Sequence, residues 1–265
     1  MSVSVETSTG FGRRFAGVWL VGVLGVLSML LQDPALDPAA LPPELRQLPP
    51  AALKALLLLN PLILLTVLAA AGAACAHRVG LASLLAGTRP AGRGTMGLAR
   101  AAAAGLAVAV IIQAIDALAA PGLGAEWQAF RLKAASAPLW PGLPVGMLYG
   151  GVAEEVMMRW GVMSAVAWGL WRVSGQRQLP GGRAELTPAV AWTAIVVAAL
   201  VFGAGHLPLL AQSMEPGPGL VLRTVGLNAL AGIVYGWQFW RHGLESAMVA
   251  HASTHVGFAL WRLAV

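Results

Sequence analysis

The sequence has few of the residues that keep a protein soluble in water. Charged residues make up only 11% of its 265 positions, against about 25% in soluble domains. Apolar residues make up 58%, against about 45–50%, and the mean hydropathy is +0.73. This balance excludes a disordered chain, a coiled coil, a nucleic-acid-binding domain and an ordinary soluble enzyme.

Cysteine and lysine are scarce as well. The single cysteine, Cys75, can form neither an intrachain disulfide nor a thiolate metal site, so it says nothing about the redox compartment. The formal charge is +6, and the basic residues lie between apolar runs, which favours membrane topology over nucleic-acid binding as their role. A chain rich in alanine and arginine, with Lys54 and Lys133 as its lysines, indicates a high-GC bacterial gene.

Seven apolar runs are long enough to cross about 30 Å of hydrocarbon, which takes about 17–25 helical residues each. The predicted spans are 15–32, 55–76, 101–120, 143–171, 189–212, 219–240 and 244–263. We therefore predict an all-α polytopic membrane protein with about seven transmembrane helices. Residues 1–142 hold three spans and an outer interfacial segment at 126–136, and residues 143–265 form the helical core that carries the site.

The basic residues favour an orientation with the N-terminus in the cytoplasm. That orientation places ten of them on inner segments and six on outer ones. Arg13 and Arg14 precede the first run, as basic residues do in a secretory signal peptide. However, the run is followed by Gln32 and Asp33 and not by the small residues of a cleavage site. We therefore expect a retained helix and an integral protein of the bacterial inner membrane.

Three ionisable side chains fall within the fourth run. They are Glu154, Glu155 and Arg159, and each costs about 2.5–3.5 kcal/mol or more at a helix centre, so by default they mark function. Residues four apart share a helix face, whereas adjacent ones do not, so we expect Glu155 to pair with Arg159 and Glu154 to face a cavity. A buried ion pair with a shielded second acid, purely structural, is the alternative.

Three histidines also fall within spans. His206 ends the fifth run, and His251 and His255 lie one turn apart on the seventh. A lone buried histidine is usually structural, but three histidines and two glutamates in one bundle are harder to explain in that way. A buried carboxylate beside a histidine can activate water, and further histidines can donate to an oxyanion. The same set can hold Zn²⁺, and both routes lead to hydrolysis.

These motifs resemble those of the CPBP family of intramembrane proteases, which includes the type II CAAX prenyl proteases and bacteriocin-immunity proteins. The family motifs EExxxR, FxxxH and HxxxN/D stand here as Glu154-Glu155 with Arg159, Phe202 with His206, and His251 with His255. The resemblance covers about residues 143–258 and includes the glycine-rich stretch 232–236. Three motifs in the family's order make it specific.

The resemblance implies a role for each matched residue. Glu154 and His206 would activate the attacking water, and His251 would help to form the oxyanion hole. Glu155 and Arg159 would orient the site.

One position departs from the family, and two others are supporting candidates. His255 stands where the family commonly has Asn or Asp, and a histidine can either donate to an oxyanion or bind a metal. Phe202 and Asn228 are the supporting candidates. A mechanism without a cofactor is favoured, and the alternative is Zn²⁺ held by Glu154, His206 and His251.

We expect an intramembrane endopeptidase that cleaves a membrane-associated protein near its C-terminal anchor or sorting signal. Its partners would be the lipid bilayer and a membrane-anchored protein or lipidated peptide, with no nucleic acid. A prenylated CAAX protein is one candidate substrate, and a C-terminal sorting helix is at least as plausible in bacteria. The alternatives are an ion- or proton-coupled transporter that uses the Glu/His cluster as a relay, and a non-catalytic immunity-type protein.

Two further expectations concern depth in the membrane. At 1.5 Å per residue, Glu154 and His206 lie roughly 27 Å from the inner ends of their runs, whereas His251 lies only roughly 11 Å beyond residue 244. For the three to meet, either the fourth and fifth helices protrude on the inner side or the 241–244 turn is sunk in a cavity. Asp116 lies near an outer helix end, where we expect it to snorkel towards water.

Overall fold

The computed structural model describes residues 10–32, 42–88, 97–174 and 186–264, and in these ranges the chain is helical, with no strand. The helices, in chain order, are α1 (Phe11–Leu27), η1 (Ser28–Leu31), α2 (Pro43–Arg46), α3 (Pro50–Cys75), η3 (Ala76–Val79), α4 (Gly97–Ala119), η4 (Ala120–Leu123), α5 (Ala125–Ser136), α6 (Gly142–Val145), η5 (Gly146–Glu154), η6 (Val156–Met163), α7 (Ser164–Val173), α8 (Pro188–Gly205), α9 (Leu207–Ser213), α10 (Pro218–His242) and α11 (Leu244–Ala264).

Each predicted span is helical, with ends within a few residues of those expected. Five helices of the described ranges are long and apolar enough to cross a membrane: 11–31, 50–79, 97–123, 188–213 and 218–242. The other two predicted spans correspond to the continuous helix 142–173 and to α11, which carry the acidic residues and two of the three histidines of the motifs. The prediction of an all-α polytopic membrane protein is therefore confirmed, while the number seven is not.

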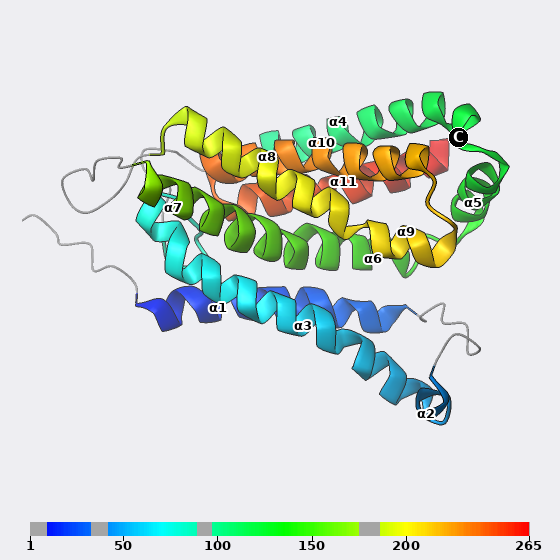
Figure 1. The fold of residues 1–265 in the computed structure, drawn as a ribbon, viewed down its shortest axis with the longest axis horizontal. Helices are drawn as coiled ribbons and strands as arrows, with labels where there is room; N and C mark the ends of the chain where they lie inside the picture. Colours follow the sequence, from blue (N-terminus) through cyan, green and yellow to red (C-terminus); the bar gives the residue numbers. More distant parts are fainter. Residues whose placement is uncertain (1–9, 33–41, 89–96, 175–185, 265) are drawn as a thin grey trace, which may run out of the picture.

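The continuous helix 142–173, built from α6, η5, η6 and α7, lies at the centre of the bundle. Helices α1 and α3 pack along one side of it, and α8, α10 and α11 pack along the other (Figure 1). Helix α4 covers the outer side of α11. The residues of the motifs on α8 and α11 are thereby brought to the same side of the central helix.

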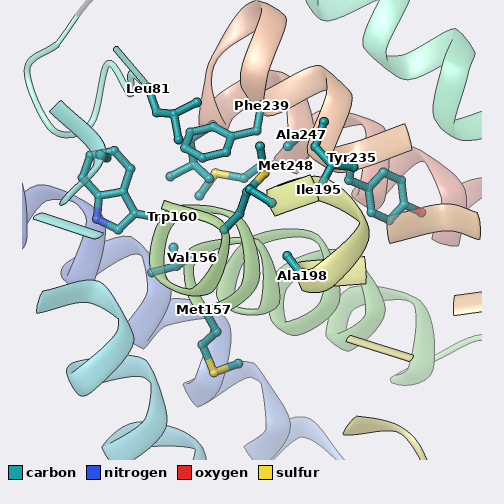
Figure 2. Packing of buried hydrophobic residues seen from close by; sticks show 14 of the residues in the cluster. Leu81, Val156, Met157, Trp160, Ile195, Ala198, Tyr235, Phe239, Ala247 and Met248 are labelled. Carbon is teal, nitrogen blue, oxygen red and sulfur yellow. The ribbon is translucent and has the colours of Figure 1, made fainter. Parts of the chain in front are cut away.

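The hydrophobic core surrounds the central helix. Its largest member is Trp160, which is fully buried and lies with its ring centroid 6.4 Å from that of Phe239 on α10. Figure 2 shows these rings with Val156 and Met157 of the central helix, and with side chains of α8 and α11 nearby. The core therefore ties together the three helices that carry the motifs.

Small residues allow α3 to approach the central helix closely. A Cβ atom on Gly72 would collide with Trp160, and one on Gly161 would lie 2.6 Å from Cβ of Leu68. The indole nitrogen of Trp160 donates to the carbonyl of Ala69 at 3.3 Å. Such close helix contacts through small residues are the usual way in which membrane helices associate, because lipid provides no hydrophobic force between them.

The turn between α10 and α11 is buried under the segment that follows η3. Gly243 adopts a φ of +95°, which favours glycine, and the neighbouring Leu244 is fully buried and donates its N–H to the carbonyl of Ala82 at 3.1 Å. Oε1 of Glu245 accepts from Oγ of Ser83 at 2.6 Å and from a backbone N–H. The turn is thus buried by its contacts with the segment that follows η3.

A small second core closes one end of the bundle. Trp127 of α5 packs there with Leu210 and Met214 near α9 and with Leu220 of α10, so α5 and α9 lie together (Figure 1). The side chain of Trp127, in the segment 126–136 that we expect at the outer interface, is 4% exposed. Trp127 is buried because it packs against protein from α9 and α10.

Candidate active site

The central helix is wound more widely than an α-helix where it carries the first motif. Residues Gly146–Glu154 and Val156–Met163 form π-helix, and Glu155 lies between the two stretches. A π-helix is rare in proteins, and where one occurs it is often at a functional site. It does not separate the side chains of the motif: Oε1 of Glu155 lies 3.0 Å from Nη1 of Arg159, as predicted, and both residues are fully buried.

Glu155 joins the first and third motifs. Its Oε1 atom accepts a hydrogen bond from Nδ1 of His251 at 2.8 Å, in addition to the contact with Arg159. A carboxylate that is bonded to two cationic or N–H groups is held in one position, and it holds the histidine ring in one orientation. Glu155 therefore holds the ring of His251 and the guanidinium group of Arg159 at one oxygen atom.

Arg159 connects this network to α8 and α10. Its Nη2 atom donates to the carbonyl of Gly232 at 3.1 Å. Its guanidinium carbon lies 4.8 Å from the ring centroid of Phe202 and 5.2 Å from that of Tyr235. Cation–π contacts of this kind are stronger away from water, so the charge of Arg159 is stabilised by two aromatic faces as well as by Glu155.

Glu154 faces a cavity, as expected from its position beside the buried pair. The cavity has a volume of about 290 Å³. Its lining includes residues of all three motifs, namely Glu154, Phe202, His206, His251 and His255. Oε2 of Glu154 lies 4.0 Å from Nε2 of His251 across this space. The remaining lining comes from α4, α6, η5, α10 and α11 and is largely apolar.

His206 is oriented by the first residue of its own motif. Its Nδ1 atom lies 2.8 Å from the carbonyl oxygen of Phe202. A carbonyl can only accept, so Nδ1 carries the proton and Nε2 of the neutral ring is left with a free lone pair. The phenyl ring of Phe202 meets His206 edge-to-face at 4.8 Å and His251 at 5.7 Å, so it keeps the two histidine rings in place.

His251 and His255 stack on one face of α11. Their ring centroids are 5.2 Å apart, and Tyr235 covers the other face of His251 at 4.5 Å. A Cβ atom on Gly146 would lie 2.5 Å from Nδ1 of His255, and one on Gly150 would lie 2.6 Å from its Nε2. The two glycines therefore provide the space that the ring of His255 occupies.

Sequence reasoning missed the aromatic and hydroxyl part of the lining. The chain has two tyrosines, Tyr149 and Tyr235, and both line the cavity. The hydroxyl of Tyr235 donates to Oγ1 of Thr254 at 2.7 Å. Because the chain has so few tyrosines and histidines, their scarcity could have indicated that both tyrosines belong to the site. Asn228, a supporting candidate, lines the cavity and donates from Nδ2 to the carbonyl of Thr224 at 2.8 Å.

Asp116 does not snorkel to water. It is 4% exposed, and its Oδ1 lies 2.7 Å from Nε of Arg223 while its Oδ2 lies 3.0 Å from Nε of Arg131. The expectation was wrong because α5 and α10 each bring an arginine to it inside the protein. Arg223 lines the same cavity as the motif residues.

The candidate zinc ligands are not gathered as a metal site. Within the described ranges, no three or more His, Cys, Asp or Glu side chains are grouped so that they could hold a metal ion. Oε2 of Glu154 and Nε2 of His251 are 4.0 Å apart, and the Nδ1 atoms of His251 and His206 are bonded to Glu155 and to a backbone carbonyl. Glu154, His206 and His251 are therefore near one another without forming such a group.

One comparison with known proteins identifies part of the chain. Residues 136–257 match the family model described as type II CAAX prenyl endopeptidase Rce1-like. The matched segment contains the three motifs and most of the residues that line the cavity. No significant match was found among curated proteins or among solved structures.

Proposed function

We propose that the chain is an intramembrane endopeptidase that hydrolyses a membrane-associated protein near its C-terminal anchor or sorting signal, because residues 136–257 match the family model of type II CAAX prenyl endopeptidases. One observation carries the proposal. Side chains of all three motifs line one cavity in a helical membrane protein, although they come from helices far apart in the sequence. Paired general bases and N–H donors around one space are what peptide hydrolysis requires.

Water is activated in this mechanism by Glu154 and His206. Nε2 of His206 accepts a hydrogen bond from the water, because Nδ1 holds the proton of the neutral ring. Glu154 takes the proton as the water oxygen attacks the carbonyl carbon of the scissile bond. The proton then passes from Glu154 to the leaving amine as the C–N bond breaks, which returns the carboxylate to its first state.

The oxyanion of the tetrahedral intermediate is stabilised by the two histidines of α11. His255 donates from one ring nitrogen as a neutral imidazole. His251 donates a hydrogen bond from Nδ1 to Glu155, so its Nε2 atom can donate to the oxyanion only when both ring nitrogens carry a proton. Each such donor contributes about 10²–10³ in kcat in other enzymes.

Substitutions at the two proposed bases test the function. Glu154→Gln and His206→Ala should each abolish processing while the protein still inserts in the membrane, and Glu215→Gln, on an exposed loop residue, should leave processing intact. The substrate can be identified by comparing the membrane proteome of a deletion strain with that of the wild type, since a protein with an uncleaved C-terminal anchor should accumulate only in the strain that lacks the enzyme. Full processing by the Glu154→Gln or the His206→Ala variant would overturn the mechanism. A proton flux in liposomes that Glu154→Gln removes would favour the transporter instead.

A further inference from the structure

Two guanidinium groups from different helices contact the indole of Trp168 on α7. The guanidinium carbon of Arg78, on η3, lies 5.5 Å from the centroid of the Trp168 ring, and that of Arg172, on α7, lies 5.8 Å from it. Arg172 follows Trp168 by four residues, so the two side chains share one face of the helix. Because η3 packs against α7, the indole holds both cations at one place on the surface.

No acidic side chain of the described ranges neutralises these two cations. Arg78 and Arg172 are both exposed, and with described residues they form neither hydrogen bonds nor ion pairs, only the contacts with the indole. Glu245, an acidic residue at the same end of the bundle, is bonded through Oε1 to Ser83 and to the N–H of Leu85. The N–H donors of both guanidinium groups are therefore available to an anion.

A third arginine lies at the same end of the bundle. Nε of Arg14 on α1 donates at 2.9 Å to the carbonyl of Ala73, which precedes Arg78 by five residues on the helix 50–79. Arg14 is 8% exposed, so its charge acts on the site from inside the protein. Figure 1 shows the start of α1 at the same end of the molecule as the ends of α3 and α7. Three separate segments thus each bring an arginine to this end.

The positions of these arginines along their helices place them near the lipid headgroups. Arg14 is near the start of the candidate span 11–31, Arg78 is next to the last residue of the span 50–79, and Arg172 is next to the last residue of the helix 142–173. Tryptophan is enriched at this depth of a membrane. Val173, which follows Arg172, is 83% exposed, so an apolar surface lies directly beside the cations.

We propose that Arg78 and Arg172 bind the phosphate group of an anionic phospholipid, with Trp168 as the residue that positions them. The phosphate oxygens accept hydrogen bonds from the two guanidinium groups, whose planar forks match phosphate geometry. Basic sites between membrane helices bind anionic headgroups in this way. The site is separate from the cavity, because Trp168 lies fourteen residues after Glu154 on the central helix, roughly 20 Å along its axis. It therefore does not rest on the proposed function.

Native mass spectrometry of the purified full-length protein in detergent measures this binding. The probes are dioleoylphosphatidylglycerol and, with the same acyl chains, the zwitterionic dioleoylphosphatidylcholine. We expect the wild type to bind the anionic lipid about tenfold or more tightly, and Arg78→Gln with Arg172→Gln to remove this preference. Arg13→Gln with Arg100→Gln is the matched control: it removes the same charge from two exposed arginines at the starts of α1 and α4 and should keep the preference.

Three results would overturn the proposal. They are equal affinity of the wild type for the two lipids, an equal loss of preference in the two double variants, and displacement of phosphatidylglycerol by millimolar inorganic phosphate, which would assign the arginines to a soluble anion. Arg172→Gln alone, at an exposed helix end, should lower the affinity for phosphatidylglycerol about threefold, so the test does not depend on folding of the double variant. The titration measures no cleavage, so failure of the endopeptidase proposal would leave its result unchanged.

Discussion

Oε1 of Glu155 is shared by His251 and Arg159, at 2.8 Å and 3.0 Å. The other carboxylate oxygen, Oε2, is buried without a hydrogen-bond partner among the described residues. A single oxygen therefore connects the central helix to α11, and the Arg159 side chain carries the connection on to Gly232 of α10. The motif written EExxxR in the sequence is in the structure a link between three helices.

Arg159→Ala should lower the stability of the whole bundle. It leaves the fully buried carboxylate of Glu155 without its main cation, and breaking a buried pair in this way costs about 3–5 kcal/mol. The expected result is a large fall in Tm of the detergent-purified protein. Arg13→Ala, which removes an exposed arginine, is the control and should change Tm little. Equal Tm values of the Arg159→Ala and Arg13→Ala variants would mean that the buried pair contributes nothing to stability.

Gly150→Ala should impair the site without unfolding the protein. The added methyl group would lie 2.6 Å from Nε2 of His255 and 3.4 Å from Nε2 of His251, so the ring of His255 must move. Processing should fall by at least tenfold, as measured with the substrate found in the deletion strain. Gly169→Ala is the matched control on the same helix: its methyl group meets nothing within 4 Å and should stabilise the helix by about 0.5–1 kcal/mol. The same loss of processing in both would exclude crowding of His255 as the cause.

His255→Asn and His255→Leu should differ in activity. Asparagine keeps an N–H donor at the position where the resembling family has Asn or Asp, so most processing should be retained. Leucine fills a similar volume without a donor, and loss of one oxyanion contact should lower kcat by about 10²–10³. Tm of both variants should stay close to that of the wild type. If leucine supported full activity, His255 would not contact the oxyanion.

Removal of metal should leave activity unchanged. The reason is geometric: Glu154, His206 and His251 are not grouped as ligands in the described part of the chain. The measurement is processing by the purified protein after dialysis against a chelator, together with metal analysis of the untreated protein. Stoichiometric zinc, with activity that is lost in chelator and restored by zinc, would establish a metalloprotease.

Much of the fold could be predicted from the sequence because a membrane imposes a simple rule. A span needs a long apolar run, so the ends of α10 and α11 lie within about one turn of those expected. The Glu155–Arg159 pair was predicted for a similar reason: residues four apart on one helix are neighbours whatever surrounds them.

The contacts that the sequence did not predict join helices that are distant in the chain. Asp116 meets Arg223 across 107 positions, and His251 meets Glu155 across 96. Trp127 looks like an interfacial residue in its local sequence, but α9 and α10 bury it. Periodicity and local spacing describe one helix at a time, so they carry no information on which faces of two helices meet.

The buried turn at Gly243 has a consequence for synthesis of the protein. The helix 142–173 carries the buried carboxylate of Glu155 and the buried guanidinium group of Arg159, and the imidazole that shares Oε1 of Glu155 lies 96 residues further along the chain. Until α11 leaves the ribosome and its first turn contacts Ala82 and Ser83, Glu155 has only Arg159 of these two partners. The polar network of the central helix is therefore completed only when α11 has been made and packs against it.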